Sequence, residues 1–233
     1  KEIGYVGVFF TKFLAVLKIG IPLFVLLAVI FYAYMILLKS EYLKYSSIVY
    51  SKQQNKSTNR KLLFISAVIS VLVSSAMTSL HWSDILKFIN GGSFNTADPL
   101  FHKDIGFYVF KLPVYQVLYS FVFGMLIILL LITLAFYLFL YTTTHFEQKS
   151  EMGNVLHMDR GSRNAIGRQI FEYAAKHISF LVSAIFLMIS LGFILKSYDL
   201  VYSPRGAAFG ASYTDVHVTL LFYRAFAVLS IIA

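Results

Sequence analysis

Histidine and aspartate side chains that could bind a metal ion or transfer protons gather in two segments of an otherwise apolar chain. They are His81, Asp84, Asp98, His102, Asp104, Asp199, Asp215 and His217. Imidazole and carboxylate groups are common metal ligands and acid–base catalysts. Their spacings, HxxD, DxxxHxD and DxH, match no established metalloenzyme motif. We therefore predict no catalytic residue, no cofactor and no metal site. The weak metal candidates are Asp98, His102, Asp104, Asp215 and His217.

Small hydroxyl residues recur at every fourth position in an apolar run. They are Ser66, Ser70, Ser74 and Thr78. A spacing of four places all of them on one face of a helix. Such residues let two helices approach closely in a membrane. We interpret the stripe as a helix-packing seam, and the alternative is one wall of a polar pathway.

Arg224 is the one ionisable residue well inside a predicted membrane span. A charge inside a bilayer is costly and is by default a candidate functional group. Its guanidinium can also extend toward the headgroups at the membrane surface. We favour a structural role, in which Arg224 anchors the fifth helix. A transporter or channel using Arg224 and the hydroxyl stripe is the alternative.

The composition indicates an integral membrane protein. The 233 residues are 58% hydrophobic and only 13% charged, with 23 Phe and 16 Tyr, and the mean hydropathy is +0.73. A soluble domain of this length carries about a quarter charged residues. The chain has no cysteine, which excludes disulfides and thiolate metal sites.

Apolar runs of roughly 20 residues predict membrane-spanning helices. We expect an all-α integral membrane fold with five spans, at residues 17–38, 62–80, 113–141, 177–195 and 216–233. The last run stops at Ala233, so the chain is expected to be part of a longer protein.

The distribution of Lys and Arg predicts which side each loop faces, because cytoplasmic loops carry an excess of them. Residues 39–61 and 142–176 hold six and five basic residues and are predicted to be cytoplasmic. Residues 81–112 and 196–215 hold three and two and are predicted to form two structured outer loops. The net charge of +9 then fits anionic lipid headgroups on the cytoplasmic side rather than nucleic acid.

Two segments beside the spans have helical character. Residues 164–176 have apolar side chains at helical spacing and predict a cytoplasmic amphipathic helix that runs into the fourth span. Residues 1–16 form either an outer interfacial segment or an early start to the first helix. Residues 51–60 are polar and predict a loop.

The first outer loop contains the stretch DPLFHKDIGFYVFKLPVY, residues 98–115. Asp98 followed by Pro99 is typical of a helix N-cap and first turn. The residues that follow, IGFYVFKL, are apolar and prone to form a β-strand. Pro113 is expected to begin the third span.

The two outer-loop sequences DPLFHKDIGFYVFKLPVYQ and SYDLVYSPRGAAFGASYTDVHV resemble Uncharacterised Protein Family 0182, which consists of large bacterial multi-pass membrane proteins. The segments EIGYVGVFFTKF and HWSDILKFIN are similar as well. The resemblance implies a seven-span domain followed by a large extracytoplasmic region. It implies no activity, substrate or catalytic residue.

These observations predict a membrane domain in the bacterial plasma membrane that anchors and positions the external region of a cell-envelope protein. Its partners would be the bilayer and the protein's own remaining spans and external region. The outer loops would be the docking surface. The predicted docking and anchoring residues are Asp98, Asp104, Arg205, Tyr213, Asp215 and Arg224. The alternatives are a transporter or channel and an envelope enzyme with an outward-facing site, although no enzyme motif is present.

Overall fold

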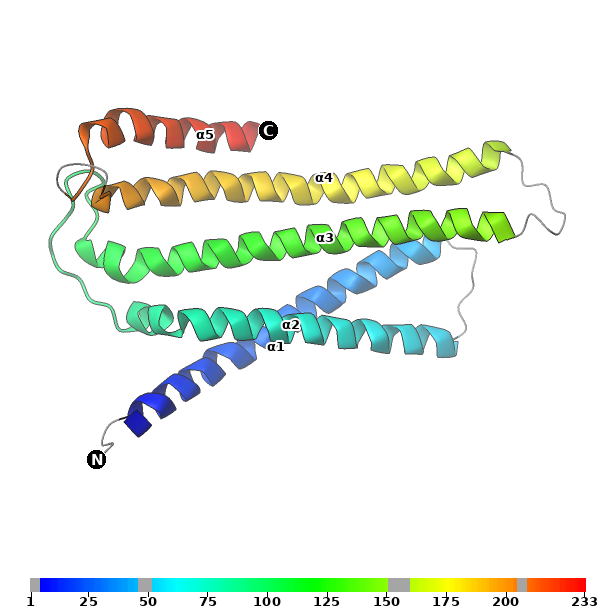
Figure 1. Ribbon diagram of the computed structural model, residues 1–233, viewed down its shortest axis with the longest axis horizontal. Coiled ribbons are helices and arrows are strands. Elements are labelled where there is room, and N and C mark those ends of the chain that lie inside the picture. The colour runs from blue at the N-terminus through cyan, green and yellow to red at the C-terminus, as the bar shows by residue number, and fades with distance from the viewer. Residues whose placement is uncertain (1–4, 46–51, 151–159, 205–208) are drawn as a thin grey trace. The chain divides into compact units, whose positions relative to one another are not determined.

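The computed structural model describes residues 5–45, 52–150, 160–204 and 209–233. These residues form an all-helical fold, and no β-strand occurs among them apart from an isolated bridge between Ala97 and Asp104. In chain order, the elements in Figure 1 are α1 (Tyr5–Tyr45), α2 (Lys52–Ile89), η1 (Phe107–Lys111), α3 (Leu112–Ser150), α4 (Arg160–Tyr198), η3 (Asp199–Tyr202), η4 (Asp215–Thr219) and α5 (Leu220–Ile232). The predicted all-α class is confirmed.

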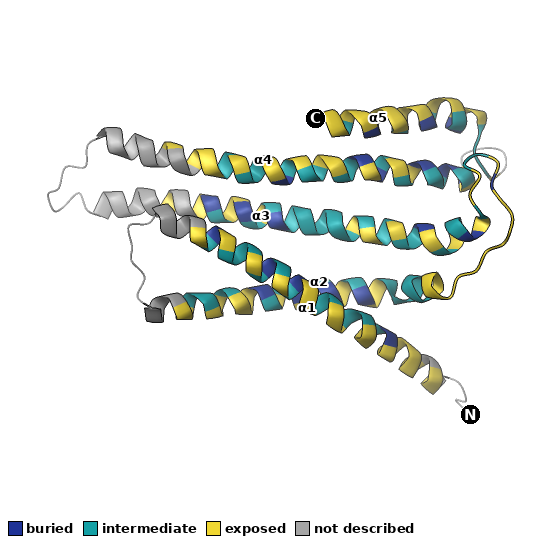
Figure 2. Ribbon diagram, turned by 180° about the vertical axis from the view of Figure 1, so that it is seen from behind, coloured by how far each residue is buried: buried dark blue, intermediate teal, exposed yellow. Residues whose placement is uncertain are grey.

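Among the described residues, five helical segments are long and apolar enough to cross a membrane. They are Phe9–Ser40, Lys56–Ile89, Phe107–Phe139, Phe171–Tyr202 and Asp215–Ile232. Between 11% and 22% of each apolar window is buried inside the protein. Figure 2 accordingly shows far more exposed and intermediate residues than buried ones along the helices. The side of a membrane on which each loop lies stays a prediction.

Several helices extend further than the sequence predicts, and α3 continues to Ser150, beyond the predicted end of its span at residue 141. α1 is continuous from Tyr5 through Pro22 to Tyr45, so the early start of the first helix is confirmed. α2 already begins at Lys52, and the expectation of a loop over residues 51–60 is therefore wrong for the described residues 52–60. Lys, Gln and Arg, which are frequent there, have good helix propensity. The predicted helix at residues 164–176 is confirmed as part of α4.

The expected β-prone segment after Gly106 is helical instead. Residues 107–111 form η1, a π-helical turn that leads directly into α3. A single strand here would leave its backbone amides and carbonyls without a partner strand, whereas a helical turn pairs them locally. The third helix therefore begins before Pro113.

The chain divides into two compact units, which are described separately. The first unit combines Lys1–Trp82 with Leu131–Ile178, and the second combines Ser83–Leu130 with Ser179–Ala233. In the first unit α1 crosses α2 (Figure 1), and a Cβ on Gly20 would lie 3.5 Å from the Thr78 Oγ1. Leu27 and Phe31 of α1 are fully buried in this unit. The Tyr34 and Thr133 hydroxyls are hydrogen-bonded to each other, which links α1 to α3.

The second unit holds the first half of α3, the second half of α4, α5 and the predicted outer loops. Aromatic side chains join α4 to α5, because the Phe193 ring lies 5.5 Å from the Phe226 ring and 6.1 Å from the Tyr223 ring. Leu112 and Leu200 are buried where these elements meet the loops. This unit contains most of the residues that the sequence singled out for chemistry or docking.

Candidate functional site

Asp98 organises the first loop of the second unit through its side chain. Its carboxylate accepts hydrogen bonds from the backbone amides of Leu100 and Phe101 at 2.8 Å and of Lys103 at 2.9 Å. The Tyr108 hydroxyl donates to the same carboxylate at 2.7 Å. Asp98 is only 6% exposed. The predicted capping role of Asp98 is therefore confirmed.

Asp104 closes the same loop from the other direction. Its carboxylate accepts from the Phe94 amide at 3.1 Å, the Gly106 amide at 2.6 Å and the Ser93 hydroxyl at 2.8 Å. A Cβ on Gly106 would lie 2.7 Å from the Asp104 Oδ1 and would also overlap the Gly92 carbonyl. Only a glycine fits this close approach, and the loop depends on it.

Both carboxylates are held in their charged form. Burial by itself would raise the pKa of Asp98, but the hydrogen bonds from the Phe101 amide, the Tyr108 hydroxyl and the Lys103 and Leu100 amides outweigh it and lower the pKa. For Asp104 the small desolvation effect is likewise outweighed by the donors of Phe94, Ser93 and Gly106, and its pKa is lowered. These groups therefore act as acceptors for the backbone rather than as proton donors.

An aromatic cluster packs the loop against the end of α4. The Tyr198 ring lies 4.9 Å from Phe101, 5.3 Å from Phe107 and 6.4 Å from Tyr108. Tyr108 in turn contacts Tyr202 at 6.5 Å. Aromatic pairs at these distances add about 0.5–1.5 kcal/mol beyond the area that they bury. The loop is thus fixed both by its carboxylates and by this cluster.

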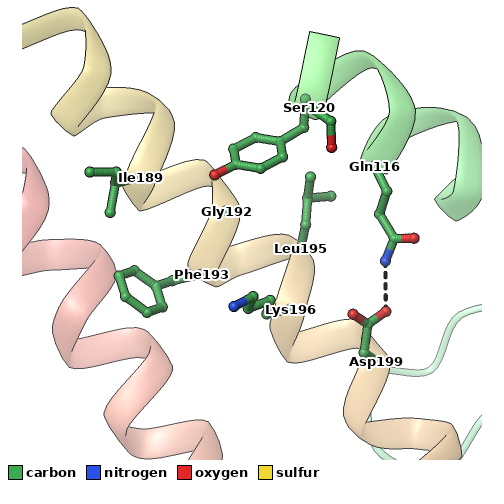
Figure 3. Close-up of a pocket in the computed structure, with 9 residues that line it drawn as sticks. Gln116, Ser120, Ile189, Gly192, Phe193, Leu195, Lys196 and Asp199 are labelled. Atoms are coloured by element: carbon green, nitrogen blue, oxygen red, sulfur yellow. Dashed lines mark hydrogen bonds between the residues drawn. The ribbon is translucent and has the colours of Figure 1, made fainter. Parts of the chain in front are cut away.

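Asp199 stands at the end of α4 beside a pocket of about 370 Å³ between α3 and α4 (Figure 3). The Gln116 Nε2 donates to the Asp199 Oδ1 at 2.7 Å, and the Tyr202 hydroxyl donates to the same oxygen at 2.6 Å. Lys196 lines the pocket one helical turn before Asp199. A neighbouring pocket of about 510 Å³ shares Gln116, Lys196 and Asp199.

The second predicted outer loop ends in a reciprocal cap. The Ser212 amide and hydroxyl donate to the Asp215 carboxylate at 3.1 and 2.8 Å, and the Asp215 amide donates to the Ser212 Oγ at 3.2 Å. This is a capping box at the start of the helix that continues into α5. Tyr213 is 77% exposed and stacks on His217 at 4.0 Å. Arg205 lies outside the described residues.

The weak metal candidates do not form a site. Asp98, Asp104 and Asp215 each bind the backbone of their own loops, while His102 and His217 are exposed. Within residues 5–45, 52–150, 160–204 and 209–233, no three His, Asp or Glu side chains lie close enough together to hold a metal ion.

The hydroxyl stripe and Arg224 belong to different units. Ser66, Ser70, Ser74 and Thr78 are all buried in the first unit. Each hydroxyl donates to a backbone carbonyl one turn earlier in α2, as in Ser70 to Ser66 at 2.7 Å and Thr78 to Ser74 at 2.6 Å. Arg224 lies on α5 in the second unit and is exposed.

The pocket beside Asp199 contains residues that the sequence analysis did not select. Asp199 was noted among the outer-loop His and Asp side chains but was not selected as a site residue. Lys196 was counted only as a basic residue of the second outer loop, and Gln116 and Tyr202 were not singled out. One signal was present, because Lys196 and Asp199 are spaced by three residues at the end of a long apolar run and therefore share a helix face. Nothing in the sequence links Gln116 to residues more than 80 positions away.

The sequence profile of the family described as "Uncharacterised protein family (UPF0182)" matches residues 1–233. The chain is a member of the UPF0182 family. Curated relatives named "UPF0182 protein" include those of Clostridium perfringens, 38% identical over 234 residues, Clostridium kluyveri, 37% identical over 235 residues, and Clostridium botulinum strain Hall, 34% identical over 242 residues. Each alignment covers 100% of this chain.

The chain spans about a quarter of the length of these relatives, with 24% of the Clostridium perfringens protein and 25% of the other two covered. No solved structure matches it. The resemblance seen in the loop sequences is therefore confirmed at the level of the family.

Proposed function

We propose that this chain is the multi-pass membrane domain of a bacterial cell-envelope protein, and that it anchors and positions a large extracytoplasmic region formed by the remainder of that protein. The observation that carries this proposal is the set of five helical segments that are long and apolar enough to span a bilayer. The greater length of the relatives supports it, because about three quarters of each lies outside the matched region.

The hydrogen bonding of the hydroxyl stripe favours an anchor over a transporter. A polar pathway needs hydroxyl groups that are free to bind water or a solute. The stripe instead buries its hydroxyls and donates them to carbonyls of α2 itself. Small side chains that hydrogen-bond to the backbone of their own helix suit a helix-packing seam without water. Arg224 belongs to the other unit.

The two predicted outer loops suit a docking surface because their described residues are held by side-chain hydrogen bonds and present aromatic side chains. The Asp98, Asp104 and Asp215 carboxylates bind groups of their own loops and so stabilise them. Exposed rings remain for a partner, with Phe209 at 89% and Tyr213 at 77% exposure. Aromatic side chains are enriched where protein surfaces meet.

Single-cysteine labelling in intact cells tests the proposal, since this chain has no cysteine of its own. We suggest Lys103→Cys in the first loop, Ser57→Cys near the start of α2 and Ser70→Cys in the seam, each in a full-length protein. Lys103 and Ser57 are exposed, and Ser70 is buried. With a membrane-impermeant maleimide, the cysteine at 103 is expected to react at once, and the cysteine at 57 only after permeabilisation.

The cysteine at 70 distinguishes the two functions. It stays unlabelled in a dry bundle that serves as an anchor. Its rapid labelling would mean that water reaches the seam, and the transporter would replace the anchor as the better proposal. Labelling at 57 but not at 103 in intact cells would show that the topology is the reverse of the predicted one.

A further inference from the structure

The pocket between α3 and α4 combines an apolar wall with two opposite charges. Its wall is formed by Ile189, Phe193 and Leu195 of α4, and its polar end by Gln116, Lys196 and Asp199 (Figure 3). All of these residues belong to the second unit. The polar end lies where the apolar segment Phe171–Tyr202 finishes. A site of this kind suits a molecule that has a polar head and an apolar tail.

The Lys196 ammonium and the Asp199 carboxylate do not form an ion pair with each other. Within the described part of the chain, the Lys196 ammonium makes no ion pair or hydrogen bond. It is therefore not paired with the Asp199 carboxylate, although both residues line the pocket. Gln116 and Tyr202 both donate to the Asp199 Oδ1 and so fix the carboxylate in place. The Asp199 Oδ2 accepts no hydrogen bond among the described residues. The same pocket is therefore bordered by the unpaired ammonium of Lys196 and by the Asp199 carboxylate, of which only Oδ1 accepts hydrogen bonds from described residues.

This pairing selects against ligands of a single charge. A purely anionic head would be attracted by Lys196 but repelled by Asp199, and a purely cationic one would meet the reverse. A zwitterion places an opposite charge at each. The carboxylate also prefers a cation that carries N–H donors, because charge-assisted hydrogen bonds are stronger than contact with a methylated ammonium group. The carbonyls at the C-terminus of α4 favour a positive group on the same side.

We propose that this pocket binds the headgroup of an ethanolamine phospholipid, with the phosphate at Lys196, the primary ammonium at the Asp199 Oδ2 and an acyl chain along Phe193 and Leu195. The proposal rests on the proposed membrane location. It gives the second unit a specific lipid ligand in addition to general contact with the bilayer.

Lipid selectivity of the full-length protein tests the assignment. The purified protein is reconstituted in nanodiscs or exchanged into detergent with palmitoyl-oleoyl phosphatidylethanolamine, phosphatidylcholine and phosphatidylglycerol, and bound lipid is counted by native mass spectrometry. Wild type is expected to prefer the ethanolamine lipid over each of the others by about tenfold, which one charge-assisted hydrogen bond can supply.

Two variants read the two charges separately. Asp199→Asn is expected to abolish the preference for ethanolamine over choline and to raise binding of the glycerol lipid, because Lys196 then stands alone. Lys196→Gln is expected to weaken ethanolamine lipid binding about tenfold. The matched control is the pair Asp84 and Lys87, which has the same spacing, belongs to the same unit and is ion-paired at 3.6 Å. Asp84→Asn and Lys87→Gln are expected to bind lipids as wild type does.

Three results would overturn the assignment. Equal binding of all three lipids by the wild-type protein would refute the lipid site. A loss of ethanolamine lipid binding in the control variants as large as that in the pocket variants would refute it as well. Displacement of the lipid by free phosphoethanolamine at equal concentration would make the ligand a soluble zwitterion. A protein that enters nanodiscs but shows no preference refutes only the lipid site, whereas one that fails to enter them refutes the proposed membrane function as well.

Discussion

The hydroxyl seam of α2 and the carboxylate loop at residues 90–106 are both polar sequences in an apolar chain, but they satisfy their polar groups in opposite ways. In the seam, each hydroxyl donates to a carbonyl of its own helix one turn away. In the loop, two carboxylates accept seven hydrogen bonds, of which five come from backbone amides that no helix or sheet pairs. If the serine and threonine hydroxyls were removed, α2 would keep its backbone hydrogen bonds. If the two aspartate carboxylates were removed, the loop amides would lose their acceptors.

The loop is therefore expected to be more sensitive to substitution than the seam. A helix pairs its own amides and carbonyls, so a hydroxyl on it adds a weak third interaction. The loop at residues 90–106 instead has exposed and partly buried amides whose partners are single side chains. Loss of one such acceptor leaves several donors unpaired. Substitutions of equal size should therefore have very unequal effects in the two regions.

The largest effect is expected for Asp98→Ala. The change leaves the Leu100, Phe101 and Lys103 amides and the Tyr108 hydroxyl without their acceptor. We expect a loss of roughly 3 kcal/mol in the free energy of unfolding, because unpaired buried donors cost about 1–3 kcal/mol each and water recovers part of it. Thermal or SDS-induced unfolding of the purified protein in detergent measures this loss.

Asp84→Ala is the control for this prediction. Asp84 belongs to the same unit and forms a partly exposed ion pair with Lys87 at 3.6 Å. Surface ion pairs contribute about 0–1 kcal/mol. Equal losses for Asp98→Ala and Asp84→Ala would mean that the carboxylate is not what holds the loop.

The next effect is expected for Gly106→Ala in the same loop. The added methyl group would overlap the Gly92 carbonyl and approach the Asp104 Oδ1 to 2.7 Å, and neither group can move without breaking the loop. Overpacking of this kind costs about 1–3 kcal/mol. Gly92→Ala is the matched control, because a Cβ there meets nothing within 4 Å. Similar unfolding temperatures for the two variants would contradict the packing described for Gly106.

A smaller effect is expected from acid. The pKa of Asp98 is lower in the folded protein than in the unfolded chain, where it is about 3.9. Its stabilising contribution is therefore complete above about pH 5 and is lost as the pH falls through the folded-state pKa. Unfolding measured from about pH 6 to about pH 3 should show stability declining at the acid end. Asp98→Asn should flatten that decline, and an unchanged slope would assign the acid sensitivity to other carboxylates.

Much of this contrast could be predicted from the sequence. The four-residue spacing of the hydroxyls predicted a buried face on a helix, since helical periodicity alone places them together. The Asp98–Pro99 pair predicted a cap and a first turn, because an aspartate oxygen reaches the amides two and three residues later. Both are local rules, and both were confirmed.

The parts that could not be predicted depend on contacts between distant residues. Residues 107–111 have β-branched and aromatic side chains that favour a strand, but no neighbouring strand is available to pair with them, and a π-helical turn forms instead. The bond from Gln116 to Asp199 joins α3 to the end of α4 and depends on how these helices pair. A single sequence carries no signal for that pairing.

The smallest effect is expected in the seam, for Ser70→Ala. The Ser70 hydroxyl donates to the Ser66 carbonyl, which helical geometry already pairs with the Ser70 amide, so its removal leaves no unsatisfied donor. We expect a change within about 0.5 kcal/mol, whereas Ser70→Leu, which is too large for a fully buried position, should cost about 1–3 kcal/mol. Unfolding in detergent measures both. The two variants together separate size from polarity: a seam needs only a small side chain at 70 and tolerates alanine, while a water-filled path needs the hydroxyl. A loss for Ser70→Ala as large as that for Ser70→Leu would show that the hydroxyl has a second partner, and the contrast between the two regions would then disappear.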